Sequence, residues 1–175
     1  SPRQHADNSY TVAKAARPIN LLIILIAQLL FYYHFHVLAP GFDYVYLIMA
    51  TLLSAAAGNI INDIKDLKAD LINKPHKVWI GNKIKPTIAW VIYWTIFFAA
   101  SILALLISVK AYFYVTCIQV LLYVYSMWLS KVPFIGNVLV SALTATVIII
   151  VPLLFPGTYD QSYWFLAGIA FGLNL

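Results

Sequence analysis

The chain has 175 residues, of which 63% are hydrophobic and only 10% are charged, and its net charge is +5. A soluble domain commonly has about a quarter of its residues charged, so this composition excludes a soluble fold and indicates that lipid covers most of the surface. The basic residues lie between apolar stretches instead of on one basic face, which argues against nucleic-acid binding.

Six apolar stretches follow one another along the chain, and a membrane-spanning helix needs about 20 such residues. Each stretch is apolar on all sides, which favours helices, because the strands of a membrane barrel alternate. The predicted fold is therefore all-α, a polytopic transmembrane helix bundle that forms one membrane domain over residues 1–175. The predicted spans are Ile19–Leu38, Tyr44–Ile61, Thr87–Val109, Ala111–Leu129, Gly136–Phe155 and an incomplete span from Tyr163.

Helix breakers and isolated charges separate these spans. Ala39-Pro40-Gly41 ends the first span and Pro156-Gly157 ends the fifth. Lys110 alone stands between the third and fourth, which predicts a tight helical hairpin at this residue.

The basic residues indicate the orientation of the bundle. Ten of the eleven Lys and Arg residues fall on one predicted side of the membrane, and only Lys110 falls on the other. Because cytoplasmic loops carry an excess of Lys and Arg, we expect the N-terminus and the 62–86 loop to be cytoplasmic, with the protein in the cell (inner) membrane.

Acidic residues are concentrated just after the second span. The chain has six Asp and no Glu, and three of the six, Asp63, Asp66 and Asp70, fall within eight residues. Asn62, Asp66 and Asp70 are spaced by four, so on a helix they form one stripe, with Asn59 and Asp63 beside it. No helix breaker precedes them, so we expect the second helix to continue out of the membrane and carry the stripe.

The oxygen ligands of this stripe suit magnesium, which keeps several waters and is usually shared with substrate phosphates. Three side-chain oxygens on one face can hold such an ion when a diphosphate completes its coordination. Lys74, His76 and Lys77 would add positive charge for the phosphate oxygens. The alternative is a solvated helix extension with neighbouring Asp and Lys. Asn59 and Asn62 argue against it, because polar residues at the end of a spanning helix are costly unless they face protein or a cavity.

The residues of the stripe also resemble a motif of a known family. The run from Asn62 to Asp70, followed by Asn73-Lys74-Pro75 and Gly81, resembles the first Asp-rich motif of UbiA-type intramembrane prenyltransferases. Arg17-Pro18, at the entrance to the first span, is similar to the usual start of that family.

A third family signature is similar to Tyr125-Ser126, Lys131 and Gly136-Asn137. Two features depart from the pattern. Lys77-Val78 stands where the family usually has Arg-Pro, and Lys lacks the bidentate geometry of Arg. The family also has about nine spans and a second Asp-rich motif, so the resemblance implies that about six spans are present and that this is an N-terminal portion.

The resemblance implies an enzyme that transfers a prenyl group from an isoprenyl diphosphate to a lipid or aromatic acceptor in the bilayer. It implies Mg²⁺ as cofactor, held by Asn62, Asp66 and Asp70, with Asp66 and Asp70 as the catalytic residues. The substrate-binding residues that it implies are Arg17, Asn59, Asp63, Lys77, Tyr125, Lys131 and Asn137.

The acceptor is less narrowly indicated. The segment Asn73–Gly81 is most similar to family members that use geranylgeranylglycerol phosphate for ether-lipid synthesis. A quinone-ring precursor of the 4-hydroxybenzoate or naphthoate type is the alternative, followed by haem or chlorophyll. From a different class, the chain would be a non-catalytic membrane carrier or assembly protein on the same scaffold.

Other polar residues have plainer interpretations. His34 and His36 lie at the far end of the first span, where we expect an interfacial belt instead of metal ligation. Tyr123 and Tyr125 either pack in the core or stabilise a carbocation with their ring faces.

Overall fold

The structure, a computed structural model, describes residues 21–82, 84–129, 146, 148–157 and 159–172. Within these ranges the chain is helical, apart from connecting segments and one isolated bridge between Ile80 and Ile84. This confirms the prediction of an all-α fold. The helices are Leu21–His34, α2 (Asp43–Asn73), the 3₁₀ turn η1 (Pro75–Lys77), α3 (Pro86–Ile107), α4 (Val109–Val124), the π-helical turn η2 (Tyr125–Leu129), residues 148–154, and α6 (Gln161–Gly172).

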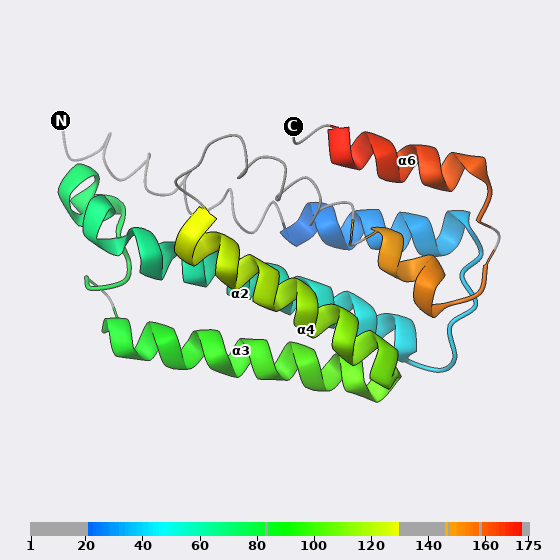
Figure 1. The fold of residues 1–175 in the computed structure, drawn as a ribbon, viewed down its shortest axis with the longest axis horizontal. Coiled ribbons are helices and arrows are strands. Elements are labelled where there is room, and N and C mark those ends of the chain that lie inside the picture. Colours follow the sequence, from blue (N-terminus) through cyan, green and yellow to red (C-terminus); the bar gives the residue numbers. More distant parts are fainter. Residues whose placement is uncertain (1–20, 83, 130–145, 147, 158, 173–175) are drawn as a thin grey trace.

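Three long helices form one side of the bundle. Figure 1 shows α2, α3 and α4 lying along one another, with the helix Leu21–His34 and α6 on the other side. The helix α2 contacts both α3 and α4. Among the described residues, three helices are long and apolar enough to cross a membrane: α2, α3 and α4 together with the start of η2. The protein is therefore an integral membrane protein.

The helix α2 runs without a break for 31 residues. It extends past the predicted end of the second span at Ile61 and carries the polar stripe, as expected. It ends at Asn73 because Lys74 precedes Pro75, and a residue before proline is disfavoured in the helical conformation. Lys74 has φ −145° and ψ 55°, and its N–H donates to the carbonyl of Asp70 at 2.7 Å.

The hairpin between α3 and α4 breaks at Ser108 and not at Lys110. Ser108 is extended, with φ −170° and ψ 160°, and its hydroxyl oxygen accepts a hydrogen bond from the N–H of Ala111 at 3.0 Å. A serine in this position caps the first turn of a helix. Lys110 lies inside that first turn, and its ammonium donates to the carbonyl of Leu153 at 2.8 Å.

The other predicted spans differ in extent or are only partly described. The first helix ends at His34, four residues before the predicted Leu38, and His36 then adopts a left-handed conformation with φ 47°. Of the predicted span Gly136–Phe155, residues 130–145 and 147 lie outside the described ranges, and 148–154 is helical. In the sixth span, α6 begins at Gln161.

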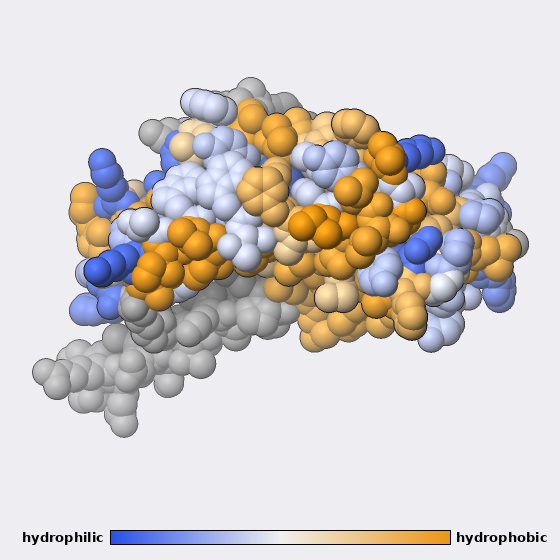
Figure 2. All heavy atoms as spheres, turned by 90° about the horizontal axis from the view of Figure 1, so that it is seen from below, coloured by the Kyte–Doolittle hydropathy of each residue, from blue (hydrophilic) through white to orange (hydrophobic). Residues whose placement is uncertain are grey.

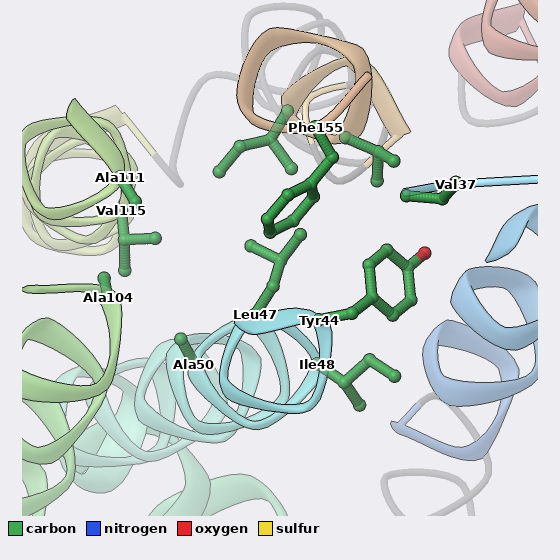
Figure 3. Close-up of a cluster of buried hydrophobic side chains, with 11 residues drawn as sticks. Val37, Tyr44, Leu47, Ile48, Ala50, Ala104, Ala111, Val115 and Phe155 are labelled. Atoms are coloured by element: carbon green, nitrogen blue, oxygen red, sulfur yellow. The ribbon is translucent and has the colours of Figure 1, made fainter. Parts of the chain in front are cut away.

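The largest cluster of buried hydrophobic residues in the described ranges lies at the end of the bundle away from the polar stripe. Figure 3 shows Tyr44 and Leu47 of α2 facing Phe155 and Val37. Fully buried alanines (Ala50, Ala104 and Ala111) line the contacts between α2, α3 and α4. Small residues let helix backbones approach closely in a membrane, where packing stabilises helix association.

The outer surface is largely apolar. Figure 2 shows hydrophobic side chains across one face and strongly hydrophilic ones mainly toward its two ends. Exposed residues on α3 and α4 include Val91, Phe98, Ile102, Leu106 and Phe113. Such a continuous apolar surface fits contact with lipid tails.

Candidate functional site

The polar stripe occupies the last turns of α2. Asn62, Asp66 and Asp70 recur every four residues, so each returns to nearly the same face, about 6 Å further along the axis. Asn62 and Asp70 are half-buried, and Asp66 is exposed. The stripe thus runs from the packed bundle to its exposed end.

Asn62 is joined to the end of the fourth helix. The hydroxyl of Ser126, in η2, donates a hydrogen bond to Asn62 Oδ1. Ser126 is only 1% exposed, so this contact lies inside the bundle. Tyr125, a predicted substrate-binding residue, is the first residue of η2 and is half-buried.

Lys65 makes a second contact with the same π turn. Its ammonium donates to the main-chain carbonyl of Met127. Lys65 follows Asn62 by three residues, a spacing that places two side chains on neighbouring positions of a helix face. Two consecutive residues of η2 are therefore bonded to one face of α2.

Asp63 faces a different neighbour. Its Oδ2 accepts a hydrogen bond of 2.8 Å from the indole N–H of Trp79 in the loop that follows η1. That loop turns back at Gly81, whose φ of 90° suits glycine, and the N–H of Gly81 donates to the carbonyl of Ile84 at 2.7 Å. Trp79 was not among the predicted site residues. The signal for it was the indole N–H itself, which needs an acceptor when it is half-buried.

Of the remaining predicted site residues, the structure describes some and not others. Asn59 is half-buried on α2, one turn before Asp63. The backbone of Lys77 ends η1. The predictions for Arg17, Lys131 and Asn137 concern residues outside the described ranges.

The donor set of the stripe is made of hard oxygens: two carboxylates and an amide. In the part of the chain that the structure describes, no three His, Cys, Asp or Glu side chains come together as a metal site. The stripe has two of the acidic groups that such a site needs, and the Asn62 amide oxygen adds a third oxygen. These residues fit part of a magnesium coordination sphere whose other ligands are waters and phosphate oxygens.

A second polar group lies away from the stripe, where His34, Tyr159 and Asp160 line an open depression of about 430 Å³. Asp160 accepts hydrogen bonds from the Ser162 hydroxyl, from Tyr163 N–H and from Ser162 N–H, which hold its pKa below the usual range. Burial raises the pKa of the Tyr159 hydroxyl. The hydrogen bonds of Asp160 cap the first turn of α6.

Long apolar helices, with a polar stripe at one end of α2, define an α-helical integral membrane protein. Residues 18–175 match the UbiA prenyltransferase family. The chain belongs to this family. Prenyltransferases of the family are generally dependent on a divalent metal.

Several relatives carry the same name. The chain is 32% identical over 135 residues to the digeranylgeranylglyceryl phosphate synthase of Methanobrevibacter smithii, an alignment that covers 73% of this chain and 46% of that protein. It is 39% identical over 94 residues to the synthase of Thermococcus gammatolerans, covering 53% of this chain and 33% of the relative. The chain spans about half the length, or less, of these relatives.

A solved structure shares the fold. It is described as "Structural and mechanistic insights into the biosynthesis of Digeranylgeranylglyceryl phosphate synthase in membranes" and aligns with a TM-score of 0.70. The sequence identity is 22%, and the alignment covers 89% of this chain and 54% of that one. The likeness supports the helical arrangement described above.

Proposed function

We propose that the full-length protein transfers a geranylgeranyl group from its diphosphate to geranylgeranylglyceryl phosphate, the acceptor of ether-lipid synthesis. Membership of the UbiA family and the names of the relatives support this activity. The strongest structural support is the stripe of Asn62, Asp66 and Asp70, which lies on the last turns of α2 at one end of the apolar bundle. The stripe offers ligands for a metal-bound diphosphate beside a surface suited to prenyl chains.

In this proposal the metal is Mg²⁺, held by the amide oxygen of Asn62 and the carboxylates of Asp66 and Asp70. When bound, it supplies positive charge that neutralises the departing diphosphate. The allylic C–O bond breaks and its electron pair leaves with the diphosphate. A hydroxyl oxygen of the acceptor then forms the new C–O bond to the allylic carbon, and its proton passes to the released diphosphate.

The protein's own residues would bind and orient the two substrates. Asn59 and Asp63 lie on α2, within one helical turn of Asn62. Tyr125 lies on η2 and precedes Ser126, which contacts Asn62. Arg17, Lys77 and Lys131 would add positive charge for phosphate oxygens, and Asn137 would complete the polar lining. The apolar helices would exclude water from the allylic cation, which water would otherwise hydrolyse.

The orientation belongs to the same proposal. The N-terminus and the 62–86 loop would face the cytoplasm, in the cell membrane, because basic residues cluster there. The diphosphate headgroup of the membrane-bound donor would face water on that side, so the stripe would meet it at the membrane surface.

An acceptor panel tests the function. The full-length protein in lipid nanodiscs is incubated with Mg²⁺, labelled geranylgeranyl diphosphate and, in separate reactions, geranylgeranylglyceryl phosphate, 4-hydroxybenzoate or a naphthoate. We expect label in the ether-lipid product and little in the aromatic products. Label in an aromatic product would instead support the quinone-ring alternative. No transfer to any acceptor would support a non-catalytic carrier or assembly role.

A further inference from the structure

The contact between α2 and α4 follows one register over two turns. Gly58 faces Leu122 of α4: a Cβ added at Gly58 would lie 3.5 Å from Leu122 Cδ1, an ordinary contact distance. Four residues further along both helices, Asn62 meets Ser126. The two helices advance in the same direction, so the Gly58–Leu122 and Asn62–Ser126 contacts belong to one register.

Ser126, in η2, continues the buried face of α4 and is itself buried. Val115 and Gln119 lie on this face, and both are 2% exposed. The spacing from 115 through 119 and 122 to 126 alternates four and three residues, as one helical face requires. A serine at the end of this face places a hydroxyl donor against the first oxygen of the stripe.

The helix widens into a π turn at this point. Such turns are rare, appear mostly as single-turn bulges, and are frequent at functional sites. In η2 the Met127 carbonyl accepts the ammonium of Lys65, next to the Ser126–Asn62 bond. The π turn therefore fastens α2 at two positions three residues apart.

We propose that η2 is a positioning clamp for the metal-binding stripe, in which Ser126 directs the amide oxygen of Asn62 and Lys65 fixes the rotation of α2. The inference rests on the proposed function, because it assigns Ser126 and Lys65 to the site that would hold the metal. An amide oxygen has two lone pairs, so the Ser126 hydrogen bond occupies one and leaves the other for a cation. Ser126 acts through Asn62 and is a positioning residue.

The test uses Mn²⁺ as the probe, with inorganic diphosphate, on the full-length protein in nanodiscs. Electron paramagnetic resonance measures the bound Mn²⁺, and Mg²⁺ titrations of prenyl transfer provide a second readout. Partners that orient a ligand typically change metal affinity 10- to 100-fold when removed, so we expect Ser126→Ala to weaken Mn²⁺ binding by about 10-fold. Ser126→Thr keeps the donor and should bind as the wild type does.

The matched control is Ser54→Ala. Ser54 is also buried on an α2 contact face, but its hydroxyl donates to the carbonyl of Ala50 in its own helix at 2.7 Å. Its removal should leave Mn²⁺ affinity unchanged. Lys65→Met should weaken Mn²⁺ binding as well, because α2 loses its second attachment. Should Ser126→Ala not fold, Ser126→Cys gives the same comparison with a weaker donor.

Wild-type Mn²⁺ affinity in Ser126→Ala would overturn the clamp, whatever its transfer activity. A different outcome would refute the proposed function without refuting the clamp. If the wild type transfers no prenyl group but binds Mn²⁺ in a way that depends on Asp66 and Ser126, the clamp stands and the prenyl-transfer proposal is wrong. A wild-type protein that binds no Mn²⁺ with diphosphate overturns both.

Discussion

The indole N–H of Trp79 donates a 2.8 Å hydrogen bond to Asp63 Oδ2, and so attaches the loop after η1 to the side of α2. The preceding residue, Asn62, is bonded to Ser126 of η2. Two adjacent residues of the Asp-rich run therefore hold two different segments. The run has a structural role beside its proposed chemical one.

Replacing Trp79 with Phe should free this loop. The hydrogen bond ends on a carboxylate that is only half-buried, so its loss should cost about 1 kcal/mol of local stability. Faster hydrogen exchange at residues 79–84, with little change around Ala104, would show the effect. Trp94→Phe is the matched control, because Trp94 packs among the rings of α3. Equal effects of the two variants would contradict a specific role for the Trp79–Asp63 bond.

Asp66→Asn and Asp70→Asn should each lower prenyl transfer by the full-length protein by about 100-fold or more, since each removes a charge from the site of the departing diphosphate. The protein should stay folded because the change in volume is small. Asp43→Asn and Asp160→Asn are the matched controls, far from the stripe, and should be nearly silent. Similar activity in all four variants would favour a merely solvated helix extension.

The orientation can be tested with reporters. A reporter inserted beside Lys77 should be accessible from the cytoplasm, and one inserted beside Gly157 should be accessible from the opposite side. The structure supports a separation between Gly157 and Lys77. The Pro156 carbonyl accepts the N–H of Leu38, so the segment that contains Gly157 lies beside the chain just beyond the end of the first helix. Labelling of both reporters from one side would refute the proposed topology.

The start of α6 should depend on pH through Asp160. Its carboxylate is stabilised by hydrogen bonds in the folded protein, so its folded pKa lies below the unfolded one. This contribution to stability is present above the unfolded pKa and is lost as the pH falls through the folded pKa. Hydrogen exchange at Ser162 and Tyr163 should therefore accelerate in acid beyond the intrinsic rate. Asp160→Asn should keep the cap and remove this acid sensitivity.

Local patterns in the sequence predicted the helices and the stripe. Apolar runs predicted the bundle, and the spacing of Asn62, Asp66 and Asp70 predicted their common face on a helix that continues past Ile61. The break between α3 and α4 was placed wrongly because a charge was taken as the separator, whereas the cap of Ser108 ends one helix and begins the next.

The partners of the site could not be predicted in the same way. Ser126 and Asn62 are 64 residues apart, and the packing of α2 against α4 and η2 brings them together. The π turn has no compositional signal, because it depends on contacts made after the helices associate. The signature that includes Tyr125-Ser126 marked the region without indicating which residue would contact α2.

The length of α2 has a kinetic consequence. Its 31 residues extend for about 46 Å, whereas the hydrocarbon core of a bilayer is about 30 Å thick. In the proposed orientation the stripe would lie at the depth of the lipid headgroups, while prenyl chains would stay among the acyl chains. In the proposed reaction both lipids would arrive by lateral diffusion, so the rate would follow their mole fraction in the membrane. Adding inert lipid at constant amounts of substrate and protein would lower the mole fraction of both substrates in the membrane. The reaction would then slow, although the bulk concentrations of substrate and protein stayed the same.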